Sequence, residues 1–249
     1  MMNIVQSIVT NNPCYKAGRK IAVKGLMLHS VGCAQPSAQV FINTFNKASY
    51  TAACVHAFID GNTGTVYQTL PWNHRGWHGG SGKNGSCNNT HIGVEICEPA
   101  GIKYAGGATF TVTDRAAALA SVRRTYNAAV ELFAFLCKLY GLDPATDIIS
   151  HCEGNKKGKS TAHSDPEHLW NGLGTGYTMG SFRRDVKANM AGEKAKIAEY
   201  TDIESIAWDL NHRGIVDDKQ GLIDAVRTEP NGRLYWLARK TLHYIRQRD

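Results

Sequence analysis

Two histidines stand at the ends of apolar, strand-like segments in this 249-residue chain. His29 ends the segment at residues 23–29, and His151 ends a shorter one at 147–151. A histidine at a strand end lies where loops line a cleft, although a single one is commonly a hydrogen-bonded structural residue. Because imidazole is a preferred ligand of Zn²⁺, the pair is a candidate for metal binding.

The polar segment around Pro166 adds further candidate ligands. His163 and Asp165 lie two residues apart, directly before this proline. Proline favours an extended conformation at Asp165, so both side chains can point to the same side. Ligands from this segment, together with His29 and His151, would form a three-ligand zinc site with an open fourth position. Such a site makes hydroxide available near neutral pH.

Glu95 lies inside the strand-like segment at residues 91–97, on the face opposite Val94. A carboxylate in the middle of a strand is costly to bury without a partner. Two interpretations follow. Glu95 faces solvent on a one-sided sheet, or it lines a cavity with a raised pKa that suits general acid–base catalysis.

The elements that must position these residues are strands mixed with helices. Asp114 begins a long helix, whose apolar residues recur at three- and four-residue steps, and Gly141 ends it. A weaker pattern near residues 37–46 predicts a second helix. Strand-like patterns occupy residues 23–29, 54–59, 64–68, 91–97 and 147–151, the second and third forming a predicted hairpin. We therefore expect an α/β fold with a central mixed β-sheet flanked by helices.

The sequence pattern changes near residue 190, which predicts two domains. We expect a larger domain at residues 1–190, a linker at 191–200 and a small all-α domain at 201–249. From Glu193 onward, basic and acidic residues number ten each, so the net charge of +7 lies in residues 1–192. A basic surface attracts nucleic acid, anionic membranes or anionic polymers. No nucleic-acid motif is recognisable, and solvated loop lysines are the plain alternative.

Composition excludes several classes of protein. Hydrophobic residues make up 43% of the chain, which argues against disorder, and no apolar run reaches the roughly 20 residues that span a bilayer. The first ten residues lack the basic and apolar regions of a secretory signal, so synthesis in the cytoplasm is expected. Seven cysteines without a CxxC motif predict reduced thiols rather than a zinc knuckle.

Six motifs give the chain a family resemblance. They are GLMLHS at 25–30, VHAFID at 55–60, GWHGG at 76–80, HIGVE at 91–95, ISH at 149–151 and HSDP at 163–166. In this order they resemble zinc-dependent N-acetylmuramoyl-L-alanine amidases, the group that includes phage lysozyme-type amidases and the peptidoglycan recognition proteins. The resemblance covers residues 20–175, and residues 165–170 are similar to prophage endolysins of clostridia and related Gram-positive bacteria.

The resemblance implies a role for each matching residue. His29, His151 and Asp165 would be the zinc ligands, and Glu95 would be the acidic catalytic residue. The position two before the third ligand is commonly Lys in the family, where it stabilises the oxyanion. Here that position is His163, so the leaving amine would receive its proton from Glu95 or His163.

Three further residues of the matching motifs are expected near the substrate. Trp77, His78 and His56 would line the substrate groove, or the two histidines would support the zinc ligands. The plain alternatives are that His56 is a buried, hydrogen-bonded structural residue and that Trp77 caps the core. Some relatives carry Tyr directly before the histidine of the second strand, and this chain has Val55 there. The same resemblance implies an amidase-like, peptidoglycan-recognition-like fold.

The implied activity is hydrolysis of the amide bond between N-acetylmuramic acid and L-alanine, by an endolysin released to the cell wall. The expected partners are the peptidoglycan of a Gram-positive wall and its anionic polymers, with no nucleic acid and no membrane insertion. The helical domain is interpreted as a wall-targeting, self-association or merely stabilising module. The alternatives are a non-catalytic peptidoglycan-binding module and an intracellular muropeptide-recycling amidase. The candidate ligand set favours an enzyme.

Overall fold

The computed structural model describes residues 4–191, 207, 210 and 219–228. The chain divides into two compact units, residues 1–193 and 194–249. In the second unit, α9 (Lys219–Thr228) contains Ile223, which is buried. The expected linker at 191–200 and most of the expected C-terminal helices lie outside the described residues, so the domain boundaries stay a prediction.

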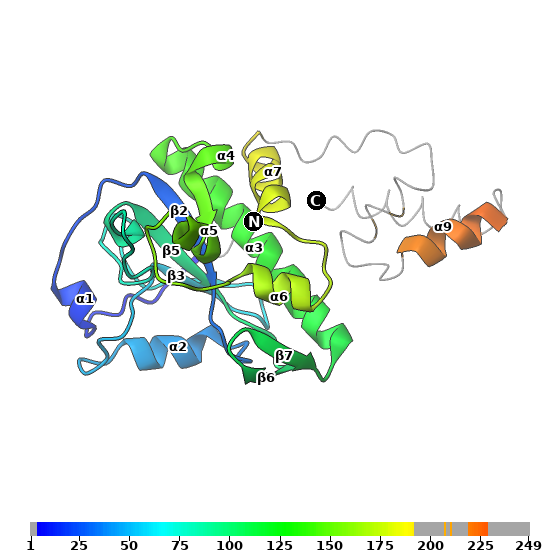
Figure 1. Ribbon diagram of the computed structural model, residues 1–249, viewed down its shortest axis with the longest axis horizontal. Coiled ribbons are helices and arrows are strands. Elements are labelled where there is room, and N and C mark those ends of the chain that lie inside the picture. The colour runs from blue at the N-terminus through cyan, green and yellow to red at the C-terminus, as the bar shows by residue number, and fades with distance from the viewer. Residues whose placement is uncertain (1–3, 192–206, 208–209, 211–218, 229–249) are drawn as a thin grey trace. The chain divides into compact units, whose positions relative to one another are not determined.

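A six-stranded mixed sheet forms the centre of the first unit (Figure 1). Its order is β1-β4-β3-β5-β2-β8, and all neighbours are parallel except β3 and β4, which form the predicted hairpin. The strands are β1 (Ile4–Gln6), β2 (Gly25–Ser30), β3 (Ala57–Ile59), β4 (Val66–Gln68), β5 (His91–Ile96) and β8 (Ile148–Ser150). The structure confirms the predicted central mixed sheet flanked by helices.

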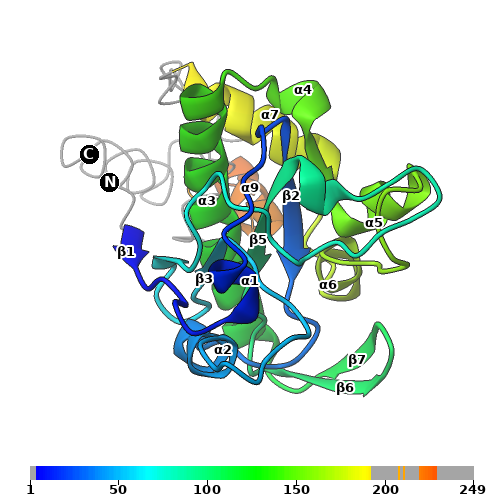
Figure 2. The ribbon, with the colours of Figure 1, turned by 90° about the vertical axis from the view of Figure 1, so that its left-hand side faces the viewer.

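One face of the sheet packs against α3 (Arg115–Tyr140) and α7 (Met179–Met190), which lie side by side (Figure 2). Leu28 and Val94 are paired in register on this face and belong to the same buried core as the helices. Alternation along β2 and β5 therefore sends their polar side chains to the opposite face. Asp114 caps α3 by accepting from the N–H of Ala117, and Gly141 ends it with a φ of 65°.

On the opposite face, Phe58, Glu95 and His29 lie side by side. The parallel register pairs Phe58 with Glu95, and Glu95 with His29. Helix α2 (Ala38–Phe45) covers the Phe58 end of this row. The rings of Phe41 and Phe58 stack with centroids 5.3 Å apart. Glu95 and His29 are left to line a pocket.

Several short elements were not predicted. The β6 (Ile102–Gly106) and β7 (Thr109–Val112) strands form a separate hairpin. The short helices are α1 (Pro13–Lys16), the 3₁₀ turn η1 (Cys87–Asn89), α4 (Pro144–Asp147), α5 (His151–Lys156) and α6 (Glu167–Gly172). These helices are short, and all of them except α6 begin at a side-chain cap. They therefore carry little of the periodicity that identifies a long helix.

Helix α5 matters for the site because it begins at His151. Ser150 and Glu153 form a reciprocal capping box that fixes this start directly after β8. His151 is therefore the first residue of a helix, where the sequence pattern predicted the last residue of a strand.

All seven cysteines lie in the described part of the chain and are free, five of them buried, as the sequence predicted. Among the described helices, none combines the length and the apolar character needed to cross a bilayer.

Candidate metal centre and active site

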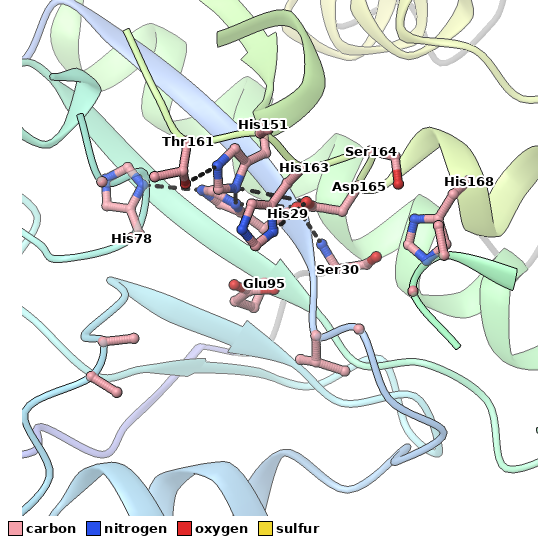
Figure 3. Close-up of a pocket in the computed structure, with 18 of the residues that line it drawn as sticks. His29, Ser30, His78, Glu95, His151, Thr161, His163, Ser164, Asp165 and His168 are labelled. Atoms are coloured by element: carbon pink, nitrogen blue, oxygen red, sulfur yellow. Dashed lines mark hydrogen bonds and ion pairs between the residues drawn. The ribbon is translucent and has the colours of Figure 1, made fainter. Parts of the chain in front are cut away.

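A cavity of about 740 Å³ opens at the ends of β2 and β5. Its floor includes His29 and Glu95, and its walls include the segment at residues 161–165 and Tyr104 of the β6–β7 hairpin. Figure 3 shows these side chains gathered from strands, loops and helix ends that are far apart in sequence. The cavity therefore collects most of the candidate residues in one place.

Three side chains converge on one point of this cavity. His29 Nδ1 lies 3.0 Å from His151 Nδ1 and 3.2 Å from Asp165 Oδ2. One potential ligand atom from each residue lies within 4.8 Å of the other two, and all three residues are buried (Figure 3). Two imidazole nitrogens and a carboxylate oxygen all present lone pairs when deprotonated, and this donor set suits a divalent cation such as Zn²⁺. The structure thus contains a possible His-His-Asp metal site.

The electrostatics of the cluster favour a carboxylate at Asp165 and a neutral imidazole at His151, while His29 holds its proton more tightly. Burial acts to raise the pKa of Asp165, but hydrogen bonding and charge from His29 outweigh it and lower that pKa. Burial also acts to lower the pKa of His29, but the hydrogen bond to Asp165 and the charges of Glu95 and Asp165 raise it overall. Burial lowers the pKa of His151 to about 4. A deprotonated carboxylate and a neutral imidazole are the forms that bind metals.

Glu95 lies on the cavity floor beside the cluster, so the structure places it in a cavity rather than on an open face of the sheet. Its Oε2 atom is shielded from solvent and has no hydrogen-bond partner among the described residues. Burial raises the pKa of Glu95 to about 8, with further raising by Asp165 and Glu98 and lowering by His29. A carboxyl group that titrates near neutral pH can both accept and donate a proton.

His163 stands at the exposed edge of the cavity. Its side chain is 57% exposed, and its Nδ1 lies 3.6 Å from Asp165 Oδ1. Its ring stacks on that of His151 with centroids 4.3 Å apart and an interplanar angle of 12°. The structure therefore holds His163 over the cluster, where it can reach a bound molecule.

Trp77 and His78 also line the cavity but differ in surroundings. Trp77 is partly buried against the core beneath α2, and its backbone pairs with Cys54. His78 is nearly buried, with Nδ1 3.0 Å from Nε2 of His29. His78 thus contacts a residue of the metal cluster directly, while Trp77 remains the better candidate for contact with substrate.

The position of His56 agrees with the alternative of a buried, hydrogen-bonded structural residue. His56 is fully buried and is not part of the cavity lining. Its Nε2 donates to the carbonyl of His74 at 2.8 Å, and its Nδ1 accepts from the N–H of Gly93 at 3.0 Å. Because the backbone occupies both ring nitrogens, we assign His56 no contact with substrate.

We expect His56 and His91 to destabilise the folded chain as pH is lowered from 6.5 towards 4. Burial lowers the pKa of both His56 and His91 to about 4, against 6.5 in the unfolded chain. Between these values the unfolded state binds more protons, so acid favours unfolding, by up to about 1.4 kcal/mol per pH unit for each histidine. Above pH 6.5 this contribution to stability is fully present.

Urea unfolding at several pH values between 4 and 7.5 measures this effect. The matched variant His91→Gln should lose less stability than the wild type over this range, because one of the contributing groups is gone. An equal change in the free energy of unfolding of the two proteins between pH 6.5 and 4.5 would contradict the prediction.

Two residues that line the cavity, Tyr104 and His168, were not predicted from the sequence. Tyr104 donates its hydroxyl proton to Glu98 Oε2 at 2.6 Å and accepts from His168 Nε2 at 2.7 Å. Tyr104 lies in the unpredicted β6–β7 hairpin, and His168 belongs to none of the six motifs. Only the tertiary structure brings these residues to the cavity wall.

Comparison with known proteins gives one family. A family model described as N-acetylmuramoyl-L-alanine amidase matches residues 18–168. The chain is similar to the N-acetylmuramoyl-L-alanine amidase CwlH of Bacillus subtilis, with 38% identity over 101 residues that cover 40% of each protein. The chain spans less than half the length of the curated relatives it matches.

Solved structures share the fold. A mutant endolysin from Bacillus subtilis matches with a TM-score of 0.50 and 24% identity, covering 75% of this chain and 99% of that one. The Staphylococcus aureus hydrolase AmiA, in complex with its ligand, matches with a TM-score of 0.54 and 20% identity, covering 78% and 87%. The fold shared with these structures therefore covers most of the first unit.

Proposed function

Because this chain belongs to the N-acetylmuramoyl-L-alanine amidase family, we propose that it is an endolysin-type zinc hydrolase. Its reaction is cleavage of the amide bond between N-acetylmuramic acid and L-alanine in bacterial peptidoglycan. The observation that carries the proposal is the convergence of His29, His151 and Asp165 beside Glu95 in one cavity.

The zinc ion would be held by His29 Nδ1, His151 Nδ1 and the Asp165 carboxylate. Zinc bound there supplies Lewis acidity toward the amide carbonyl and lowers the pKa of a water molecule at the same site. Three protein ligands are the number found in catalytic zinc sites, which keep one position for water or substrate.

Glu95 serves as the general base and then as a general acid. Its carboxylate accepts the proton of the attacking water, because it lies on the cavity floor next to His29 and its Oε2 atom has no other partner among the described residues. The same group can then pass this proton to the leaving amine of L-alanine. A pKa raised to about 8 by burial suits both steps near neutral pH.

His163 stabilises the carbonyl oxygen as negative charge develops on it. Its exposed ring stacks over His151 and can donate a hydrogen bond into the cavity. It occupies the position two before the third ligand, where relatives commonly have Lys. His163 is therefore the second candidate donor of a proton to the leaving amine.

We further propose that the natural substrate is a Gram-positive cell wall. The charge of +7 in residues 1–192 would attract anionic wall polymers through screened electrostatics. Trp77 would contact the glycan or stem peptide along the cavity. The protein would be made in the cytoplasm and released to act on the wall.

Digestion of purified Gram-positive walls tests the proposed reaction. The expected result is release of new L-alanine amino termini without new reducing sugar ends, and loss of this release when zinc is chelated. Wall binding without bond cleavage would instead identify a non-catalytic peptidoglycan-binding module.

We expect deletion of residues 194–249 to separate catalysis from wall targeting. All residues assigned to the reaction precede this region, so hydrolysis of small soluble muropeptides should be retained. Lysis of intact walls should fall, because the deleted unit is proposed to hold the enzyme on the wall or to associate with a second copy. Equal loss or equal retention on both substrates would contradict the targeting role.

A further inference from the structure

We propose that His78 and Thr161 are positioning residues that keep the two ligand histidines in the tautomer whose Nδ1 lone pair faces the metal. The inference rests on the proposed zinc site. Each residue links one ligand imidazole to a backbone carbonyl. A carbonyl oxygen can only accept a hydrogen bond, so it fixes which atom is the donor in each hydrogen bond of the link that ends on it.

The first link runs from His29 through His78. The Nε2 atom of His78 lies 3.1 Å from the carbonyl oxygen of His91, so Nε2 must carry the proton. In neutral His78 the Nδ1 atom is then an acceptor, and it lies 3.0 Å from Nε2 of His29. His29 must therefore donate from Nε2. Its Nδ1 atom, which lies 3.2 Å from Asp165 Oδ2, is the nitrogen left for a metal that displaces the proton shared with this carboxylate.

The second link runs from His151 through Thr161. The Thr161 hydroxyl donates to the carbonyl oxygen of Gly79 at 3.4 Å. Its oxygen also lies 3.2 Å from Nε2 of His151 and accepts the proton from that nitrogen. His151 is thereby held with its Nδ1 lone pair facing Nδ1 of His29, 3.0 Å away.

Both links involve the loop at residues 78–79, because His78 lies in it and the Thr161 hydroxyl donates to the carbonyl oxygen of Gly79. This loop is itself held in place. The Oδ1 atom of buried Asn88 accepts from the N–H groups of His78 and Gly79, at 3.0 and 2.8 Å. A Cβ atom at Gly93 would overlap the His78 ring, so glycine at this position of β5 makes room for it. Gly93 on β5 and the side-chain amide of Asn88 therefore both support the position of His78.

Of the two roles expected for His78, the same contacts favour support of a zinc ligand over a hydrogen bond to substrate. Both of its ring nitrogens are engaged, one by His29 and the other by the His91 carbonyl. Hydrogen-bond partners of metal-bound histidines fix ring orientation and tautomer, and their loss typically costs about 10- to 100-fold in metal affinity.

Metal affinity in the full chain tests the proposal. Zn²⁺ dissociation constants are measured by chelator competition, and Co²⁺ absorption spectra report ligand geometry, neither of which needs turnover. Two pairs of variants are compared. In each pair, one substitution removes the hydrogen-bonding group and the other keeps one. The pairs are His78→Leu with His78→Asn, and Thr161→Val with Thr161→Ser. Asn keeps an acceptor at the Nδ1 position, and Ser keeps the hydroxyl. His74→Leu is the control, because His74 is a buried histidine whose ring packs near Tyr15 and not against a residue of the cluster.

We expect His78→Leu and Thr161→Val to weaken Zn²⁺ binding by about 10- to 100-fold and to alter the Co²⁺ spectrum. His78→Asn and Thr161→Ser should keep most of the affinity. His74→Leu should bind zinc like the wild type. Unchanged affinity in folded His78→Leu and Thr161→Val would overturn the proposal, as would equal losses in both members of each pair. A wild type that binds no zinc would refute the metal site itself.

A second measurement covers the case in which His78→Leu does not fold. Nitrogen-15 chemical shifts of the histidine rings in the zinc-loaded wild type identify the protonated nitrogen. The proposal predicts Nε2–H for both His29 and His151. Coordination through Nε2 of either ring would overturn it.

Discussion

Glu95→Gln is expected to lower turnover on muropeptides by at least about 100-fold while zinc remains bound. The amide keeps the shape of the carboxylate but cannot accept the proton of the attacking water, and general acid–base catalysis typically contributes 10²- to 10⁴-fold. The three proposed ligands are untouched by the change. Steady-state hydrolysis and the zinc content of the purified variant measure the two effects separately.

The matched control for this substitution is Glu98→Gln. Glu98 is also a buried carboxylate, and its charge acts on Glu95, but its oxygens bond to Tyr104 and the backbone of Gly32. Removing this charge should cost far less activity than removing Glu95. Full activity in Glu95→Gln, or an equal loss in both variants, would exclude Glu95 as the base.

Asp165→Ala is expected to abolish both zinc binding and hydrolysis. The substitution removes the anionic ligand and leaves two buried imidazoles facing each other 3.0 Å apart. Lewis-acid stabilisation is worth several kcal/mol, and each 1.36 kcal/mol is tenfold in rate, so turnover should fall by at least about 1000-fold. Metal analysis and hydrolysis of a soluble muropeptide measure the losses.

Rescue distinguishes loss of a ligand from loss of the fold. Asp165→Cys supplies a thiolate, which is also a zinc ligand, and should recover zinc binding in part. Thermal unfolding of Asp165→Ala in the presence of chelator should resemble that of the metal-free wild type. An Asp165→Ala variant that retains stoichiometric zinc would remove Asp165 from the site.

The sequence predicted the parts of the fold that depend on strong periodicity. Alternation in β2 and β5 correctly separated core residues such as Leu28 and Val94 from His29 and Glu95. The long helix α3 begins after Asp114 and ends before Gly141, as its caps predicted. These features are local, so they can be seen without knowing what packs against them.

The arrangement of the site depended on contacts that no local pattern encodes. Whether Glu95 faced solvent or a cavity was decided by segments distant in sequence, such as residues 161–165, which line the same cavity. The sequence left open whether His78 would contact substrate or support a zinc ligand, because nothing in its motif shows that its ring lies against His29. The β6–β7 hairpin was missed as well, since its short strands have exposed or half-buried side chains at most positions.

The most direct test of the proposed metal centre is an anomalous difference map recorded at the zinc absorption edge from crystals of the zinc-loaded protein. We predict a peak bonded to His29 Nδ1, His151 Nδ1 and an Asp165 oxygen, beside Glu95. A zinc peak held by other residues, or no peak in this cavity, would contradict the account.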